Sequence, residues 1–435
     1  MALLGCQNVN NPDWVRERPP NAEEPFVILW LKNNYFHPVG RLLALDRHLG
    51  QLLGQTCEAS HVLPDGSVAD SSFYTNRDLT RLSPEDIYRG ATTQPGPTPP
   101  FTVTKVKAGG GARGFFGRDA LGARFLFKLD LPDYPELTTG AEVVGSRLIW
   151  ALGYNVPEMY IVTIEGTGDP RFDGRRALAS RFLPGEIVGP FKYYGVRDRR
   201  EMRALQLAQG WLNNVDCTDF NTLITWDREG HLARFWILDF SSALGSTDHG
   251  PKEPKQGWEH TWDVFEQLTD LVTLGLDTDP YDRNAKPFSP AVGLFDDNYD
   301  PWRWKPLMPN MAFADMTEAD ARWLAEKIAA FTPEQLRAAI AAAEYSRQED
   351  RDYLLQMLLR REAILRRTFL SGGFTSASKS GSRPSRRGAP GCWAKARPGS
   401  RNWSSRGRAP ASAPSQRARR VPGERPRASP REACG

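Results

Sequence analysis

The chain has 435 residues, of which 40% are hydrophobic and 11% aromatic, so it is long enough for roughly two to three domains with a substantial core. Its formal net charge of +4 hides an uneven distribution. Residues 371–435 hold 15 of the 56 Lys and Arg and 2 of the 52 acidic residues, so the remaining 41 basic and 50 acidic residues give 1–370 a net charge of −9. The negative charge of residues 1–370 argues against nucleic-acid binding as the main function. The sequence has no run of about eighteen apolar residues, which argues against a membrane-spanning helix.

The five cysteines are scattered, and none belongs to a Cys-x-x-Cys pair or a cluster with His. They are Cys6, Cys57, Cys217, Cys392 and Cys434. This pattern predicts neither a structural zinc site nor a disulfide framework. A small buried side chain explains Cys217 more simply than a nucleophile does.

The first residues, Leu3-Leu4-Gly5-Cys6, resemble the lipobox at which bacterial lipoproteins are cleaved and acylated on Cys. The basic and apolar regions of a signal peptide do not precede it. If upstream codons encode them, we expect a cell-envelope lipoprotein anchored at Cys6. Without them we expect a cytoplasmic protein, and coincidence explains four residues equally well.

Residues 1–95 are predicted to form an N-terminal extension. Within it, 8–24 are a polar leader, 26–31 a short buried strand, and 39–53 a helix by the spacing of its leucines. The segment 92–100 contains four prolines and is predicted to be a linker. We therefore place a domain boundary after residue 95.

A glycine-rich segment follows a predicted strand at 101–107. Gly109, Gly111 and Gly114 form a Gly-x-Gly-x-x-Gly pattern, in which backbone amides can approach phosphate oxygens closely. A dinucleotide-binding loop is an alternative, but it requires a helix directly after the glycines. The segments 115–118 and 124–129 instead favour a β-hairpin, as in a phosphate-covering loop.

Lys128 lies near the end of this hairpin and is a candidate for binding nucleotide phosphates. It needs an acidic partner, and the predicted helix at 138–153 offers Glu142. Glu142 also fits a capping box with Thr139, so Glu136 is kept as a second candidate. A lysine at a strand end is otherwise an ordinary solvated residue.

The second half of the chain contains a pattern of acidic and amide residues at defined spacing. A strand at 159–164, a crossing segment at 181–185 and an amphipathic helix at 198–212 lead to Asp216. Asn221 follows five residues later, and Asp239 eighteen residues after that. The intervening segments 222–225 and 235–238 predict a hairpin that brings Asn221 and Asp239 to the same end, where two oxygen ligands can share a hard cation. Asp is also common in turns and at strand ends, so a structural role fits these residues taken alone.

This order of elements resembles the protein-kinase-like superfamily, in particular atypical bacterial kinases of the HipA type. The spacing Asp-x-x-x-x-Asn and the later Asp match the kinase pattern. The His-Arg that precedes the Asp in ordinary kinases is replaced by Asn214-Val215, and the segment after Asp239 lacks the usual Gly. The segment 153–157, Gly-Tyr-x-Val-Pro, is a further point of resemblance to the HipA type.

The resemblance implies a two-lobed α+β fold with an N-lobe at 96–190 and a C-lobe at 191–370. It implies transfer of the ATP γ-phosphoryl group to a hydroxyl of an unknown protein or small molecule. Asp216 would handle the acceptor proton, Asn221 and Asp239 would bind Mg²⁺, and Lys128 held by Glu142 would bind the phosphates. An inactive pseudokinase scaffold and an AMP transferase on the same fold are the alternatives.

Helices are also predicted at 261–274, from 317, from 332, and at 350–369, whereas most of 275–315 is predicted to be irregular. Residues 371–435 contain no Leu, Ile, Met or Tyr and are rich in Arg, Ser, Pro and Gly. Such a tail cannot bury enough apolar area to offset its ordering entropy, so we expect it to be disordered. A basic tail can bind nucleic acid or an acidic membrane, but the abrupt change in composition favours an out-of-frame translation product.

Overall fold

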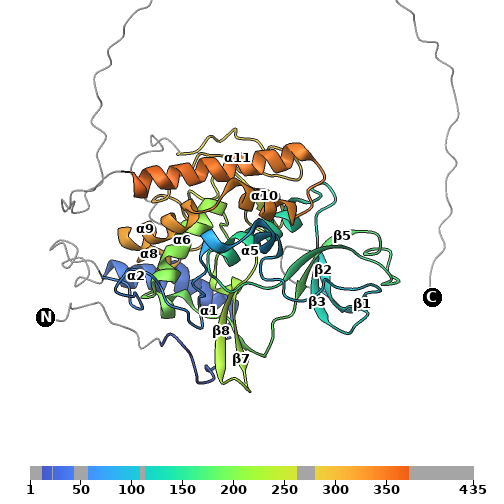
Figure 1. Ribbon diagram of the computed structural model, residues 1–435, viewed down its shortest axis with the longest axis horizontal. Coiled ribbons are helices and arrows are strands. Elements are labelled where there is room, and N and C mark those ends of the chain that lie inside the picture. The colour runs from blue at the N-terminus through green and yellow to red at the C-terminus, as the bar shows by residue number, and fades with distance from the viewer. Residues whose placement is uncertain (1–11, 22, 44–56, 108–112, 262–279, 372–435) are drawn as a thin grey trace, which may run out of the picture. The chain divides into compact units, whose positions relative to one another are not determined.

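The computed structural model describes residues 12–21, 23–43, 57–107, 113–261 and 280–371. Contacts divide the chain into two units, Met1–Ser380 and Gly381–Gly435, and every described residue belongs to the first. The predicted tail after residue 371, most of the leucine-rich stretch 39–53 and nearly all of the predicted helix 261–274 lie outside the described residues. The fold is α+β, with antiparallel sheets and helices (Figure 1).

The first sheet has five antiparallel strands in the order β1-β2-β3-β5-β4. The strands are β1 (Thr102–Val106), β2 (Arg113–Arg118), β3 (Arg124–Leu129), β4 (Met159–Thr163) and β5 (Arg176–Arg181). The hairpin predicted at 115–118 and 124–129 is confirmed as β2 and β3, with Phe115 opposite Phe127 and Gly114 opposite Lys128. The strand predicted at 159–164 is confirmed as β4.

The two faces of this sheet differ in their contacts. Because side chains alternate along a strand, Phe125, Phe127 and Leu129 share one face of β3, where they join a phenylalanine-rich core with Phe101 and Phe115. Lys128 lies on the opposite face of the sheet, beside its partner on β5, Leu178. Leu178 packs in the larger of the two hydrophobic cores. The alternation therefore directs Lys128 toward the rest of the molecule.

Helix α5 (Leu137–Ala151) packs against strands β3, β4 and β5 and against the helices α4 (Pro84–Arg89) and α10 (Pro333–Ala341). Fourteen of its fifteen residues are buried, as expected for a helix with neighbours on all sides. Two glycines allow this close approach. An added Cβ at Gly140 would lie 2.4 Å from the ring of Tyr345, and one at Gly145 would lie 2.8 Å from Phe240.

The remaining elements are mainly helical. A second antiparallel sheet combines β6 (Glu186–Gly189), which precedes helix α6 (Arg200–Leu212), with β7 (Thr222–Asp227) and β8 (Leu232–Ile237), which follow it. A short ribbon of β9 (Ser246–Thr247) and β10 (Gly250–Pro251) comes next. The predicted hairpin after Asn221 is confirmed as β7 and β8. Helices α8 (Met311–Ala314), α9 (Glu318–Ala329), α10 and α11 (Gln348–Leu365), the last followed by a π-helical turn at Arg366–Leu370, complete the described part of the chain.

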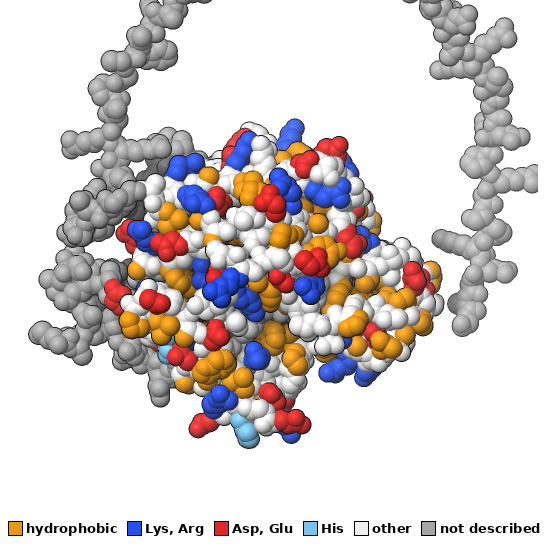
Figure 2. Space-filling model, viewed as in Figure 1, with side chains coloured by type: hydrophobic (Ala, Val, Ile, Leu, Met, Phe, Trp, Pro, Cys, Tyr) orange, Lys and Arg blue, Asp and Glu red, His pale blue; other side chains and the backbone are white. Residues whose placement is uncertain are grey.

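The helix starts predicted at Thr317 and Thr332 are confirmed, because both residues form capping boxes, with Asp320 and Gln335 respectively. None of the helices in the described residues is both long and apolar enough to cross a membrane. On the face in Figure 2, Lys and Arg side chains lie intermixed with Asp and Glu side chains. The division into an extension and two lobes at residues 95 and 190 stays a prediction.

The strand predicted at 26–31 is wrong, because these residues form helix α1 (Phe26–Leu31). A short apolar run does not distinguish a strand from a helix by periodicity. The helix continues through a π-helical turn, Lys32–Phe36, into α2 (His37–Leu42). Phe26 stacks on Phe220 with ring centroids 5.0 Å apart.

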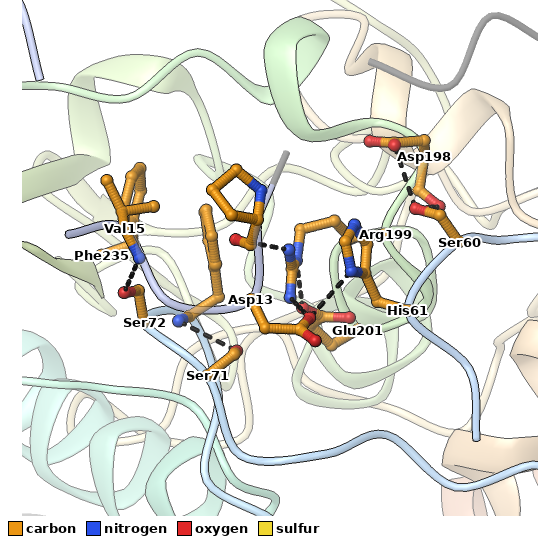
Figure 3. A network of polar contacts seen from close by, with 12 residues as sticks. Asp13, Val15, Ser60, His61, Ser71, Ser72, Asp198, Arg199, Glu201 and Phe235 are labelled. Atoms are coloured by element: carbon orange, nitrogen blue, oxygen red, sulfur yellow. Dashed lines mark hydrogen bonds and ion pairs between the residues drawn. The ribbon is translucent and has the colours of Figure 1, made fainter. Parts of the chain in front are cut away.

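A buried polar network joins residues near the N-terminus to the start of α6 (Figure 3). Arg199 is fully buried and contacts Glu201 Oε1 at 2.5 Å and Asp13 Oδ1 at 3.1 Å. His61 Nδ1 lies 2.8 Å from the same oxygen of Asp13, and the Arg199 guanidinium stacks 4.3 Å from the ring centre of Phe73. The segment before α1 is therefore bound to the helix that leads to Asp216.

We predict that Arg199→Met lowers the free energy of unfolding by about 3–5 kcal/mol, because it leaves the buried Glu201 carboxylate without its cation. Denaturant titration followed by tryptophan fluorescence measures the change. Arg322→Met is the matched control, since Arg322 forms an exposed i,i+4 pair with Glu326 and its loss should cost about 0.5 kcal/mol or less. Equal losses in the two variants would contradict the prediction.

Candidate functional site

Three charged residues from distant parts of the chain meet between the first sheet and α5. The Lys128 ammonium on β3 forms an ion pair with Glu142 Oε1 on α5 and lies 2.9 Å from Asp239 Oδ2 in the loop after β8. Glu142 Oε2 accepts a hydrogen bond from the backbone N–H of Phe240, at 3.1 Å. Glu142 therefore binds both the lysine and the loop that carries Asp239.

Burial and neighbouring charge determine the protonation of these groups. Glu142 is fully buried, and burial together with the negative charge of Asp239 raises its pKa to about 7. Burial alone would lower the pKa of Lys128, but Asp239 and Glu142 outweigh it and raise that pKa. Burial works against ionisation of Asp239 too, yet the charge of Lys128 and the hydrogen bonds from Ser241 hold its pKa below the ordinary value. Lys128 and Asp239 are thus both charged at neutral pH.

The backbone at Asp239 has an uncommon conformation that orients its carboxylate. Its φ is +57°, in the left-handed region that side chains other than glycine rarely adopt. Asp239 Oδ1 accepts a hydrogen bond from the backbone N–H of Ser241 at 3.0 Å, while Oδ2 contacts Lys128. The side chain remains 27% exposed, so part of the carboxylate is accessible.

Asp216 and Asn221 lie in the 213–221 loop, which connects α6 to β7. Asn221 Nδ2 donates to the carbonyl oxygen of Asp216 at 2.5 Å, which closes the loop and leaves Asn221 Oδ1 as a further acceptor. Burial and the negative charge of Asp239 raise the pKa of the Asp216 carboxyl to about 6. Asp216, Asn221 and Asp239 are all partly exposed.

The amide and carboxylate oxygens of Asn221 and Asp239 are ligands that Mg²⁺ accepts. Among the described residues, no group of three or more His, Cys, Asp or Glu is arranged to hold a metal ion. Two protein ligands are enough for Mg²⁺ where substrate phosphates supply further oxygens. In donor type, Asn221 and Asp239 are therefore compatible with Mg²⁺.

The capping role considered for Glu142 is wrong, because α5 begins at Leu137 and Glu142 lies inside it. Asp130, directly after β3, caps the start of the helix instead. Its carboxylate accepts hydrogen bonds from the backbone N–H groups of Glu136, Thr138 and Thr139, at 2.9 to 3.0 Å. Sequence reasoning missed Asp130, since its distance from the helix start does not match a standard capping pattern. The reserve candidate Glu136 accepts from Ser346 N–H at 2.9 Å.

The glycine pattern lies only partly within the described residues. Gly109 and Gly111 are outside them, whereas Gly114 belongs to β2, opposite Lys128. An added Cβ at Gly114 would lie 1.9 Å from the carbonyl oxygen of Phe127. Close pairing with the strand that carries Lys128 is thus a structural reason for this glycine.

We predict that Gly114→Ala lowers the free energy of unfolding by roughly 1–3 kcal/mol, because β2 or β3 must shift to accommodate the methyl group. Gly195→Ala is the control, since an added Cβ there has no other atom within 4 Å. Urea denaturation of the two variants and the wild type measures the difference. Equal stability of Gly114→Ala and wild type would show that β2 and β3 adapt without cost.

Asp219 has partners that the sequence did not predict. Its carboxylate accepts from Asn33 Nδ2 at 3.0 Å and from the backbone N–H of Tyr193 at 2.8 Å. Burial raises the pKa of Asp219. Asn33 comes from the π-helical turn after α1, so the N-terminal segment contacts the same loop that carries Asp216.

No protein-family model and no curated protein matches the chain. The solved structures with a weak similarity to it include the following two. The proinflammatory kinase CtkA of Helicobacter pylori has 12% identity and a TM-score of 0.36, with 62% of this chain and 97% of that chain covered. HipA of Shewanella oneidensis MR-1, from a toxin–antitoxin complex with HipB and operator DNA, has 10% identity and a TM-score of 0.32, with 78% and 85% covered.

Proposed function

We propose that this chain is a phosphotransferase that moves the γ-phosphoryl group of Mg²⁺-bound ATP to a hydroxyl of a protein or small molecule. The observation that carries the proposal is the placement of Lys128 between Glu142 and Asp239, together with the charge of Asp239 acting on Asp216. A positioned lysine, a metal-binding carboxylate and a nearby base are the parts that phosphoryl transfer needs.

The charge balance of the site supports a requirement for a divalent cation. The positive charges of Lys128 and Lys107 act on the carboxylates of Asp239 and Glu142. Asp216 and Asp248 add negative charge: Asp248 acts on Lys107 and on Asp216, and Asp239 acts on both as well. A triphosphate adds more negative charge, so it should bind well only with a counter-ion such as Mg²⁺.

Asn221 and Asp239 would hold the Mg²⁺, which offsets the charge of the β and γ phosphates when bound. Lys128 binds phosphate oxygens, and Glu142 keeps its ammonium in place. Asp216 takes the proton of the acceptor hydroxyl as its oxygen bonds to the γ phosphorus. The bond from that phosphorus to the β–γ bridging oxygen breaks, and ADP leaves.

Incubation with Mg²⁺ and ATP labelled at either the α or the γ position tests the reaction type. The chain's own hydroxyls and water serve as acceptors when no other is added. Phosphotransfer predicts γ label on the chain or as inorganic phosphate, and no α label on the chain. The α label on the chain would indicate AMP transfer instead, whereas nucleotide binding without transfer of either label would indicate a scaffold.

We predict different defects for the two aspartates. Asp239→Ala should weaken Mg²⁺-ATP binding and also turnover, because Asp239 binds the cation. Asp216→Ala should leave Mg²⁺-ATP affinity nearly unchanged while turnover falls by roughly 10²- to 10⁴-fold, the usual value of general-base assistance. Calorimetry with and without Mg²⁺, beside single-turnover rates, separates binding from chemistry.

Asp352→Ala is the control for this pair, since Asp352 is an exposed residue of α11. It should match the wild type in both measurements. If Asp239→Ala binds Mg²⁺-ATP as tightly as the wild type does, Asp239 is not a metal ligand.

We also predict a pH dependence for the reaction. Asp216 must be deprotonated to accept the hydroxyl proton, and its pKa is raised to about 6. The value of kcat/KM should therefore fall as the pH drops below about 6 and level off above it. Asp216→Asn should lose this limb, whereas Glu142→Gln, which keeps Asp216, should retain it at a lower overall rate. A limb that persists in Asp216→Asn would assign it to another group.

A further inference from the structure

Lys252 lies directly after β10, and its side chain is almost fully buried, with 4% of the residue exposed. Its ammonium donates to the carbonyl oxygen of Ser242 at 2.7 Å and to that of Asn213. Asn213 begins the 213–221 loop, which carries Asp216. Ser242 ends the 239–242 loop, which begins with Asp239. One side chain from a third segment thus binds both loops.

One short hydrogen bond joins the far ends of the two segments, from Leu238 N–H, directly before Asp239, to the carbonyl oxygen of Asn221 at 2.8 Å. Around residues 213–215 the direct contacts are longer. The backbone N–H of Val215 donates to the carbonyl oxygen of Ser242 at 3.3 Å, and Asn214 Nδ2 lies 3.5 Å from the carbonyl oxygen of Asp239. A hydrogen bond at 3.5 Å is weak. At the end of the 213–221 loop that follows α6, Lys252 therefore provides the shorter connection, and it shares the Ser242 carbonyl with Val215.

The acceptor at Asn213 is held in place from its other side. Asn213 has φ of +52°, and its side-chain oxygen accepts from Trp304 Nε1 at 2.9 Å. The backbone N–H of Lys252 itself donates to the carbonyl oxygen of Gly245 at 2.8 Å. Both ends of the Lys252 contact are thus fixed by further hydrogen bonds.

No described carboxylate forms an ion pair with Lys252. Burial, together with the positive charge of Arg361, holds the pKa of Lys252 well below its usual range. A neutral amine still donates hydrogen bonds, so the contacts with the two carbonyl groups do not depend on its charge. What Lys252 supplies is a fixed geometry between the loops.

We propose that Lys252 is a positioning residue, which holds the 213–221 and 239–242 loops in the relative placement that lets Asp216 and Asp239 act on one phosphoryl group. This inference rests on the proposed phosphotransferase function. The reason is geometric: a displacement of about 1 Å between groups that must act together can reduce a rate by roughly 10²-fold.

Lys252→Met tests the inference, because methionine fills a similar volume and cannot donate a hydrogen bond. Lys252→Gln is a second variant that retains a donor on a shorter side chain. Lys327→Met is the matched control. Lys327 is a half-buried lysine whose pKa is also lowered by burial, and it donates to Asn76 Oδ1 and to the carbonyl oxygen of Arg77, away from both loops.

We expect Lys252→Met to reduce the single-turnover rate by about 10- to 100-fold while Mg²⁺-ATP affinity stays within about threefold of wild type. Lys252→Gln should fall between the wild type and Lys252→Met. Hydrogen exchange should show lost protection of the Val215 amide in Lys252→Met. Lys327→Met should change neither the rate per folded molecule nor this protection, even where it lowers stability.

The inference is overturned if Lys252→Met keeps the wild-type rate, or if its rate falls only in step with the folded fraction, as in Lys327→Met. If Lys252→Met does not fold, Lys252→Gln decides, and an unchanged rate in that variant refutes the inference. A wild-type chain that binds nucleotide without any transfer would refute the proposed function. Lost protection of Val215 would then identify Lys252 as a structural residue only.

Discussion

The ion pair between Lys128 and Glu142 is the contact on which the arrangement of the site depends. Both side chains are buried, so neither charge is hydrated and each needs the other to offset the cost of desolvation. Asp239 adds a second carboxylate to the same ammonium, and the Phe240 N–H binds the second oxygen of Glu142. A strand, a helix and a loop are thereby joined through one lysine.

This ion pair places strict demands on α5. The helix must approach the 239–242 loop closely enough for Glu142 to reach the Phe240 amide, and Gly145 allows that approach. It must also begin at a defined point after β3, and Asp130 binds three of its first free N–H groups. Asp130 contacts Arg176 on β5 at 3.3 Å, so the helix start is tied to the sheet that carries Lys128. The position of Glu142 thus follows from packing along the whole helix and not from the ion pair alone.

The sequence predicted those parts of the fold that depend on neighbouring residues. Strand–turn–strand patterns identified the hairpins β2–β3 and β7–β8, and the capping signals at Thr317 and Thr332 identified α9 and α10. The strand predicted for Phe26–Leu31 was wrong, because an apolar run of six residues fits a buried strand and a helix alike. The spacing of Thr139 and Glu142 also suggested a capping box. In the structure the Glu142 side chain instead binds Lys128, which lies fourteen residues earlier in the sequence.

The contacts of Asp219 and Lys252 could not be predicted from spacing, because they join segments far apart in the sequence. Asn33 and Asp219 are 186 residues apart, and Lys252 binds carbonyl groups, which every residue has. These contacts share a feature with the Arg199 network: each binds a distant segment to α6 or to the loop that follows it. Arg199 fixes the start of α6, Lys252 and Trp304 fix Asn213 at its end, and Asn33 fixes the loop beyond. In the proposed reaction Asp216 accepts a proton at a defined point, which requires a rigid support, and three separate parts of the chain hold α6 and the loop that carries Asp216.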